Sequence, residues 1–277
     1  SKDAALGLLS RVHLYMGSYD EVINTVNTML GGATPASKLD ADLANYFINA
    51  KTSSETLFCI AHEPTETPGQ DGMGWGEIYP TSPLLYLYER YPMDLRYTSF
   101  IHPQYPDPLL NSTTVYFPDP ETADDASGRL NLSFVVTPDG ENYKFTDGGK
   151  TYIVEKKTVN GEYFEYHVNY KGEDYLARVH ETMKNRDTNP IYYVSKFSYQ
   201  DGDPMLSSPV ICRWGEVILN RAEAYAQLGQ DAKAYEDVNV IRKRAGIPAD
   251  GMFSTSDKHG YASALDVVLD ERRLELA

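Results

Sequence analysis

The sequence predicts a mainly α-helical protein with an irregular, partly β excursion, so that its overall class is α+β. Two observations lead to this prediction. Apolar residues recur at helical spacing over residues 1–40 and 210–277, whereas residues 41–209 are rich in proline, glycine and tyrosine. We therefore expect one domain over residues 1–277, in which a helical scaffold at both ends carries a loop- and β-rich segment on the ligand side.

A first helical hairpin is predicted within residues 3–30. Its apolar residues fall at three- and four-residue spacing, and on each helix they would share one face. They are Leu8, Leu9, Val12 and Tyr15 on the first helix and Val22, Val26, Met29 and Leu30 on the second. Gly17-Ser18 interrupts the pattern and Gly31-Gly32 ends it, as expected for a short turn and a helix terminus.

A second hairpin is predicted within residues 213–245, and a further helix within residues 261–277. The segments Leu9–Tyr15 and Leu219–Tyr225 share the pattern L-x-R-x-x-x-Y, so the two hairpins resemble each other. They also resemble tetratricopeptide units, which stack because one hairpin cannot bury its own apolar face.

The clearest β signal is a hairpin near residues 151–170. The strands Thr151–Val159 and Glu162–Tyr170 flank Asn160-Gly161, a pair suited to a two-residue turn with positive φ. On the second strand aromatic and apolar residues alternate with polar ones, so we expect one face of this hairpin to be covered.

Charge and composition exclude several classes of protein. Aspartate and glutamate number 40 against 25 lysines and arginines, for a net charge of −15. No excess of cations is available to displace the counterions of nucleic acid, so no nucleic-acid partner is expected. No apolar run of the ~18 residues needed to span a bilayer is present. Cys59 and Cys212 lie among apolar neighbours and are expected to be buried small side chains.

The residues contain no recognisable catalytic or metal-binding motif, so no catalytic residue, metal or cofactor is predicted. The six histidines lack metal-ligand spacing. Among so many carboxylates, no pair stands out as a glycosidase pair. An acidic segment lacks the EF-hand pattern and is expected to be a solvated loop; its residues are Asp119, Glu121, Asp124 and Asp125.

The best candidate for a ligand site is the glycine-rich segment 70–79. Trp75 and Tyr79 supply flat apolar rings that suit the C–H faces of sugars, and Gln70 and Asp71 supply polar partners for hydroxyl groups. Two placements of Trp75 stay open: presentation at the surface, or packing of the loop onto the helical core. Trp214 lies in an apolar helical pattern and is expected in the core.

Several segments resemble the SusD/RagB family. Residues 213–225 (RWGEVILNRAEAY) match R-x-x-E-x-x-L-x-x-A-E-A-Y, and residues 234–246 (AYEDVNVIRKRAG) match A-x-x-x-(I/V)-N-x-(I/V)-R-x-R-A-G. Residues 271–277 (ERRLELA) match E-R-R-x-E-L-A. Charged residues of these segments are expected to form ion pairs that fix helix register; they are Arg221, Glu223, Arg242, Glu271 and Arg272.

The resemblance implies an outer-membrane lipoprotein of Bacteroidota, lipid-anchored and exposed at the cell surface. It implies a binding protein, not an enzyme, that captures oligosaccharide and delivers it to a SusC-like TonB-dependent transporter. It also implies that this chain lacks the family's N-terminal portion and its extreme C-terminus. Two other hypotheses are a tetratricopeptide-like scaffold that binds a peptide or protein, and a glycoside hydrolase suggested only by carboxylates and aromatic residues.

Overall fold

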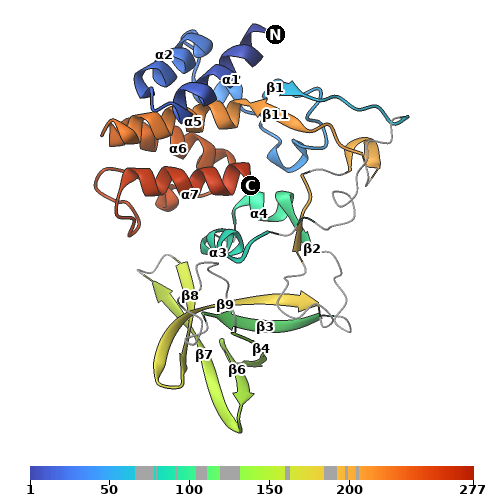
Figure 1. Cartoon of the computed structure of the whole chain (residues 1–277), viewed down its shortest axis with the longest axis vertical. Helices are drawn as coiled ribbons and strands as arrows, with labels where there is room; N and C mark the ends of the chain where they lie inside the picture. The colour runs from blue at the N-terminus through green and yellow to red at the C-terminus, as the bar shows by residue number, and fades with distance from the viewer. Residues whose placement is uncertain are drawn as a thin grey trace. The chain divides into compact units, whose positions relative to one another are not determined.

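The computed structural model describes residues 1–65, 78, 80–91, 93–103, 111–118, 132–159, 163–183, 192–196, 199–203 and 206–277. The chain forms two compact units, which are coloured by residue number in Figure 1. The helical unit comprises Ser1–Ile78, Pro92–Ile101 and Val194–Ala277, and the sheet unit comprises Tyr79–Tyr91 and His102–Tyr193. The presence of both helices and a large sheet confirms the predicted α+β class.

The helical unit is built around a buried central helix. Its principal helices are α1 (Lys2–Tyr15), α2 (Tyr19–Leu30), α5 (Trp214–Gln227), α6 (Asp231–Arg244) and α7 (Ala264–Leu276). Helix α5 contacts each of the other four, and nearly all of its residues from Trp214 to Tyr225 are buried. One side of α5 packs on α1 and α2 through Trp214 and Val217, and the other packs on α6 and α7 through Ile218 and Leu219.

The face that α1 buries differs from the predicted one. The residues that α1 buries are the small ones Ala4, Gly7 and Ser10, together with Leu14. Val12 is 50% exposed and Tyr15 is 84% exposed, so they do not belong to the buried face. The physical reason is close approach: a Cβ on Gly7 would lie 2.8 Å from the sulfur of Cys212. On α2 the predicted apolar residues, Val22, Val26, Met29 and Leu30, are all buried.

Shorter elements complete the helical unit. They are the 3-10 helices η1 (Pro35–Lys38), η2 (Leu43–Asn45), η3 (Gln200–Gly202) and η4 (Ala249–Gly251), the helix α4 (Leu95–Phe100) and the strands β1 (Thr56–Cys59) and β11 (Val210–Arg213). Strands β1 and β11 pair antiparallel, with Thr56 opposite Arg213. The division between the two units falls within β2 (Ile101–Pro103) and within β10 (Tyr192–Val194), which pair in a second two-stranded sheet.

The sheet unit contains a seven-stranded antiparallel sheet with the order β4-β3-β9-β8-β7-β6-β5. Its strands are β3 (Asn111–Phe117), β4 (Leu132–Val135), β5 (Thr137–Asp139), β6 (Asn142–Asp147), β7 (Lys150–Val159), β8 (Tyr163–Tyr170) and β9 (Glu173–Met183). Helix α3 (Ser82–Arg90) packs against β8. One face of the sheet buries an aromatic cluster in which the rings of Phe134 and Phe145 stack at 4.3 Å.

Strands β7 and β8 occupy the segment in which alternation predicts a hairpin. Val154 lies opposite Val168, and both side chains are buried in the aromatic cluster. Alternate residues of a strand point to opposite faces, so Val168 and Tyr170 of β8 face this cluster, whereas Glu165 and His167 lie on the other face and are half-buried. The predicted turn Asn160-Gly161 and the acidic segment 119–125 lie outside the described residues.

Candidate functional site

The predicted sugar-binding residues Gln70, Asp71, Trp75 and Tyr79 lie outside the described residues. The structure therefore leaves that prediction untested. The described residues do contain a second candidate, a pocket in the helical unit that lies beside a buried network of charged side chains. Arg213 belongs to both the network and the lining of the pocket.

Arg96 lies at one end of this charged network, and its side chain is fully buried. Asp94 caps the N-terminus of α4 by accepting a hydrogen bond from the main-chain N–H of Arg96, and it also accepts from the Arg96 guanidinium at 2.7 Å. The same guanidinium reaches α7, where its Nη1 lies 2.6 Å from Glu271 and 3.2 Å from Glu275. Arg96 thus ties the start of α4 to the last turns of α7.

Glu275 connects this end of the network to the rest. It accepts from Nη1 of Arg213 at 2.5 Å and also pairs with Arg244, and both arginines pair in turn with Glu55. Burial alone raises the pKa of Glu275, but Arg244, Arg213 and Arg96 together hold that pKa well below its ordinary value. The carboxylate is therefore ionised in the folded protein.

A glycine makes room for this network at the start of α5. A Cβ on Gly215 would lie 2.5 Å from Nη1 of Arg213 and 3.1 Å from an oxygen of both Glu275 and Glu55. No real Cβ approaches a nitrogen so closely, and the guanidinium is held in place by its two carboxylates. The family pattern allows any residue at position 215, so the pattern alone does not show that a glycine is needed there.

The ion pairs expected from the sequence motifs are present. Arg221 of α5 pairs with Asp237 of α6 at 2.7 Å, and Arg242 of α6 pairs with Glu271 of α7 at 2.9 Å. Glu223 of α5 pairs with Arg272 of α7 at 3.0 Å. Each pair joins two different helices, which confirms the predicted ion pairs; that they fix helix register stays a prediction.

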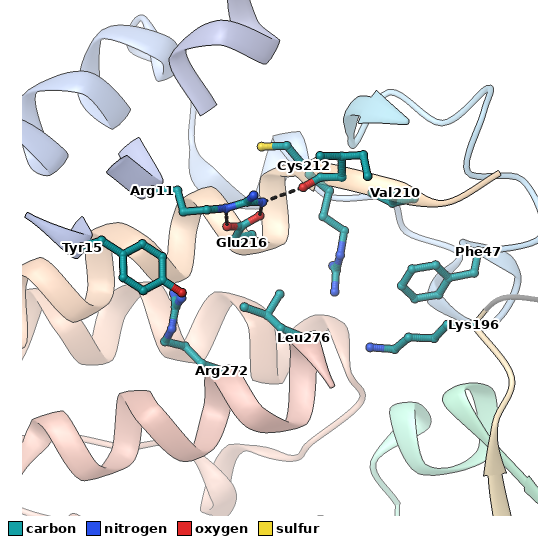
Figure 2. A pocket seen from close by; sticks show the side chains of 11 residues that line it. Arg11, Tyr15, Phe47, Lys196, Val210, Cys212, Glu216, Arg272 and Leu276 are labelled. Carbon is teal, nitrogen blue, oxygen red and sulfur yellow. Dashed lines mark hydrogen bonds and ion pairs between the residues drawn. The ribbon is translucent and has the colours of Figure 1, made fainter. Parts of the chain in front are cut away.

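The pocket has a volume of about 290 Å³ and is shown in Figure 2. Its lining comes from α1, α5, α7, β11 and two connecting segments: Arg11, Tyr15, Phe47, Lys196, Val210, Ile211, Cys212, Arg213, Glu216, Arg272 and Leu276. Arg11 donates two hydrogen bonds of 2.6 Å to the carboxylate of Glu216 and a third to the main-chain oxygen of Ile211. Four of the lining residues are cationic types, whereas Glu216 is the single carboxylate among them.

Lys196 lies on the opposite side of the pocket from Arg11, and its amine points toward the interior in Figure 2. The residue is only 6% exposed. Its Nζ lies 4.3 Å from the centre of the Phe100 ring and 5.2 Å from that of Phe47, and it donates a hydrogen bond of 3.1 Å to the main-chain oxygen of Glu275. Burial, and then the nearby Arg213, hold the pKa of Lys196 well below its ordinary value.

The predictions for the tryptophan and cysteine side chains have mixed outcomes. Trp214 is buried in the core between α5 and α2, as predicted. Cys212 is also buried, and burial raises the pKa of its thiol to about 12. Cys59 is only half-buried, so the expectation for it was wrong. The reason is its place on β1, where register shifts on both sides of Phe58 interrupt the pairing with β11.

Sequence reasoning missed the residues that make up the pocket and part of the network. Glu55, Lys196, Arg213 and Arg244 were not identified as candidates, although Arg213 and Arg244 lie in segments that match the family patterns. A charged residue inside an otherwise apolar segment could have indicated a buried ion pair. Glu55 gave no such indication, because it stands in an irregular segment far from its partners in sequence.

Within the described part of the chain, no helix combines the length and apolar character needed to cross a membrane. In those same ranges, no group of three or more histidine, cysteine, aspartate or glutamate residues is arranged to hold a metal ion.

Several solved structures share the fold of this chain. A putative sugar binding protein from Bacteroides vulgatus is 22% identical with a TM-score of 0.55, over 100% of this chain and 44% of that one. A SusD-like protein from Bacteroides fragilis is 19% identical (TM-score 0.54, 100% of this chain, 52% of that one). A SusD superfamily protein from Bacteroides thetaiotaomicron is 20% identical (TM-score 0.57, 98% and 46%). At these identities the similarity establishes the fold.

The family follows from the sequence itself. Residues 44–277 match the SusD family (SusD_RagB), and the chain belongs to that family. No curated protein is significantly similar to the chain. The chain spans about half the length of the SusD-like structures that it matches.

Proposed function

We propose that this chain is part of a cell-surface glycan-binding protein that captures oligosaccharide and delivers it to a SusC-like TonB-dependent transporter. The observation that carries the proposal is the family match over residues 44–277. One of the similar structures is described as a putative sugar binding protein, which is consistent with it. In this proposal the protein binds without catalysis and is held at the outer membrane by a lipid anchor.

We place the oligosaccharide on the segment 70–79, with Trp75 and Tyr79 as stacking platforms and Gln70 and Asp71 as partners for hydroxyl groups. The support is chemical. Aromatic rings cover the apolar faces of sugar rings, and a few polar groups at the rim fix their orientation. The alternative placement of Trp75, packed onto the helical core, predicts instead that its removal destabilises the fold.

Affinity electrophoresis on plant, host and microbial polysaccharides tests both parts of the proposal. Trp75→Ala and Tyr79→Ala are compared with the wild type and with Phe58→Ala, which removes an exposed ring from β1. We expect one class of polysaccharide to retard the wild type and the Phe58→Ala variant but not the other two. Retardation of none of the proteins contradicts glycan binding, and equal retardation of all four contradicts the placement.

Co-purification tests the partner. The same gene product carrying an affinity tag is expected to retain a TonB-dependent transporter when it is extracted from outer membranes in mild detergent. Recovery of the tagged protein without any such transporter contradicts the delivery step, while leaving glycan binding intact.

A second candidate function is a helical scaffold that binds a peptide or protein, as tetratricopeptide-like hairpins do. One observation favours it: Leu9 and Val12 of α1, together with Met16 directly after it, are exposed apolar side chains. This hypothesis predicts that Val12→Asp abolishes capture of the partner while Trp75→Ala leaves it unchanged. The glycan proposal predicts the reverse for polysaccharide binding.

A further inference from the structure

The charges of the buried network balance without Lys196. Four guanidiniums and four carboxylates pair with one another. They are Arg96, Arg213, Arg242 and Arg244 on one side and Glu55, Asp94, Glu271 and Glu275 on the other. At the pocket, Arg11 is neutralised by Glu216 and Arg272 by Glu223. A charged Lys196 would therefore add one positive charge that nothing in this balance offsets.

The surroundings of Lys196 do not supply the missing anion. Among the described residues, no carboxylate oxygen lies within ion-pair distance of its Nζ, and its hydrogen bond goes to a neutral main-chain carbonyl. The aromatic rings of Phe47 and Phe100 accommodate an ammonium group, but they carry no charge. A buried ammonium is costly unless an anion accompanies it, and the open side of Lys196 is the pocket.

We propose that the pocket binds a carboxylate-bearing sugar, a uronic acid, with the carboxylate against Lys196. The volume of about 290 Å³ lies at the lower end of the range of small-molecule pockets, which suits one sugar ring and not a chain. Lys196 supplies the charge, and the apolar side chains of Val210 and Leu276 provide surfaces for the ring. The choice of a sugar rests on the proposed function, whereas the choice of a carboxylate rests on the charges.

Binding of such an anion should be coupled to protonation of Lys196. The charged groups that face this amine are Arg213 of β11, Arg96 of α4, Arg244 of α6 and Glu275 of α7, and cations predominate among them. With burial they lower the pKa of Lys196, so the free amine gives up its proton more readily than an ordinary lysine. A bound carboxylate opposes that effect, so the complex takes up a proton as it forms.

Isothermal titration calorimetry with D-galacturonic acid and D-galactose tests the inference, because the carboxylate of the first sugar is a hydroxymethyl group in the second. We expect the wild-type chain to bind galacturonate about 10- to 100-fold more tightly, the value of one hydrogen bond to a charged group. Lys196→Met should bring galacturonate down to the affinity of galactose. Lys233→Met, which removes an exposed lysine of α6 outside the pocket, should leave both affinities unchanged.

The same titrations in buffers of different ionisation enthalpy should show proton uptake with the wild type and none with Lys196→Met. If the methionine variant does not fold, as judged by circular dichroism, Lys196→Gln takes its place. Equal affinity for the two sugars, undetectable binding of both, or unchanged galacturonate binding by the Lys196 variant each overturn the inference.

The outcome is distinguishable from that of the proposed function. Capture of neutral polysaccharide that depends on Trp75, without any preference for galacturonate, contradicts only this inference. Binding of galacturonate that depends on Lys196, in a protein that no polysaccharide retards, supports the pocket and contradicts the oligosaccharide site.

Discussion

Replacement of Arg96 by methionine should destabilise the helical unit strongly. The guanidinium is fully buried and reaches three carboxylates, those of Asp94, Glu271 and Glu275. Two of these keep another cation when Arg96 is removed, because Glu271 still pairs with Arg242 and Glu275 still pairs with two arginines. The variant therefore leaves one buried carboxylate, Asp94, without an ion-pair partner.

The expected loss in the free energy of unfolding follows from this single unpaired carboxylate. Breaking one buried ion pair by removing one partner costs about 3–5 kcal/mol, mostly because the remaining charge stays buried. Arg273→Met is the matched control, because Arg273 is half-exposed and forms an i,i+3 pair with Asp270. An exposed pair of this kind contributes about 0–1 kcal/mol. The two substitutions remove the same side chain, so their difference isolates the effect of burial.

Urea unfolding followed by helix circular dichroism measures both variants at neutral pH. The double variant Asp94→Asn/Arg96→Met should be less destabilised than the sum of its single variants, because no unpaired charge remains. A loss for Arg96→Met that is no larger than that for Arg273→Met would refute the reasoning. So would strict additivity in the double variant, since it would mean that the stranded carboxylate carries no penalty.

Three further predictions concern the same unit. Because the pKa of Glu275 is lowered, this carboxylate contributes stability that is present above its ordinary pKa of 4.5 and is lost as the pH falls below that value. In urea titrations Glu275→Gln should therefore be less stable than the wild type at neutral pH, and its free energy of unfolding should fall less on acidification. Gly215→Ala should destabilise by about 1–3 kcal/mol in thermal unfolding, although alanine normally stabilises a helix, because its Cβ would clash with Arg213. Leu14→Ala should cost about 2–5 kcal/mol and Val12→Ala less than about 1 kcal/mol in the same urea assay, because α1 buries only the former.

Each of these has a clear contradiction. If the free energy of unfolding of Glu275→Gln fell with pH as steeply as that of the wild type, other groups would govern acid unfolding. A higher melting temperature for Gly215→Ala would show that the arginine moves aside at little cost. If Leu14→Ala and Val12→Ala lowered the free energy of unfolding equally, the buried face of α1 would be the one that apolar spacing predicts.

Helices and strands with strong local signals were predictable from the sequence. The glycines that follow α2, α5 and α6 take left-handed conformations at Gly31, Gly229 and Gly246, in agreement with the breaks in apolar spacing. The buried face of α1 was not predictable from apolar spacing, because that pattern considers large apolar residues and leaves Gly7 out. Small residues at three-residue spacing mark a face that packs closely equally well, and here that face lies against Cys212 of β11 and Leu57 of β1.

The pocket could not be predicted from the sequence, because its charged groups meet only through the tertiary fold. Glu55 and Glu275 share Arg213 and Arg244, yet they stand at opposite ends of the sequence and no local spacing relates them. The motifs revealed the pairs within the C-terminal helices because both partners lie in matched segments. Lys196 lies within the family match over residues 44–277, but only the tertiary structure shows that it has no acidic partner among the described residues.

The buried charges of the helical unit therefore fall into two kinds with opposite consequences. A guanidinium that already faces carboxylates on several elements fixes those elements, and its replacement reports on stability. Among the described residues Lys196 has no ion-pair partner, and Glu275 is the single carboxylate among the charged groups that face it. Burial lowers the pKa of Lys196, so by linkage this lysine costs stability below its folded-state pKa, and the cost falls as the pH rises toward the ordinary value of 10.5. A residue that weakens the fold while lining its pocket is better explained by what it binds than by what it holds together.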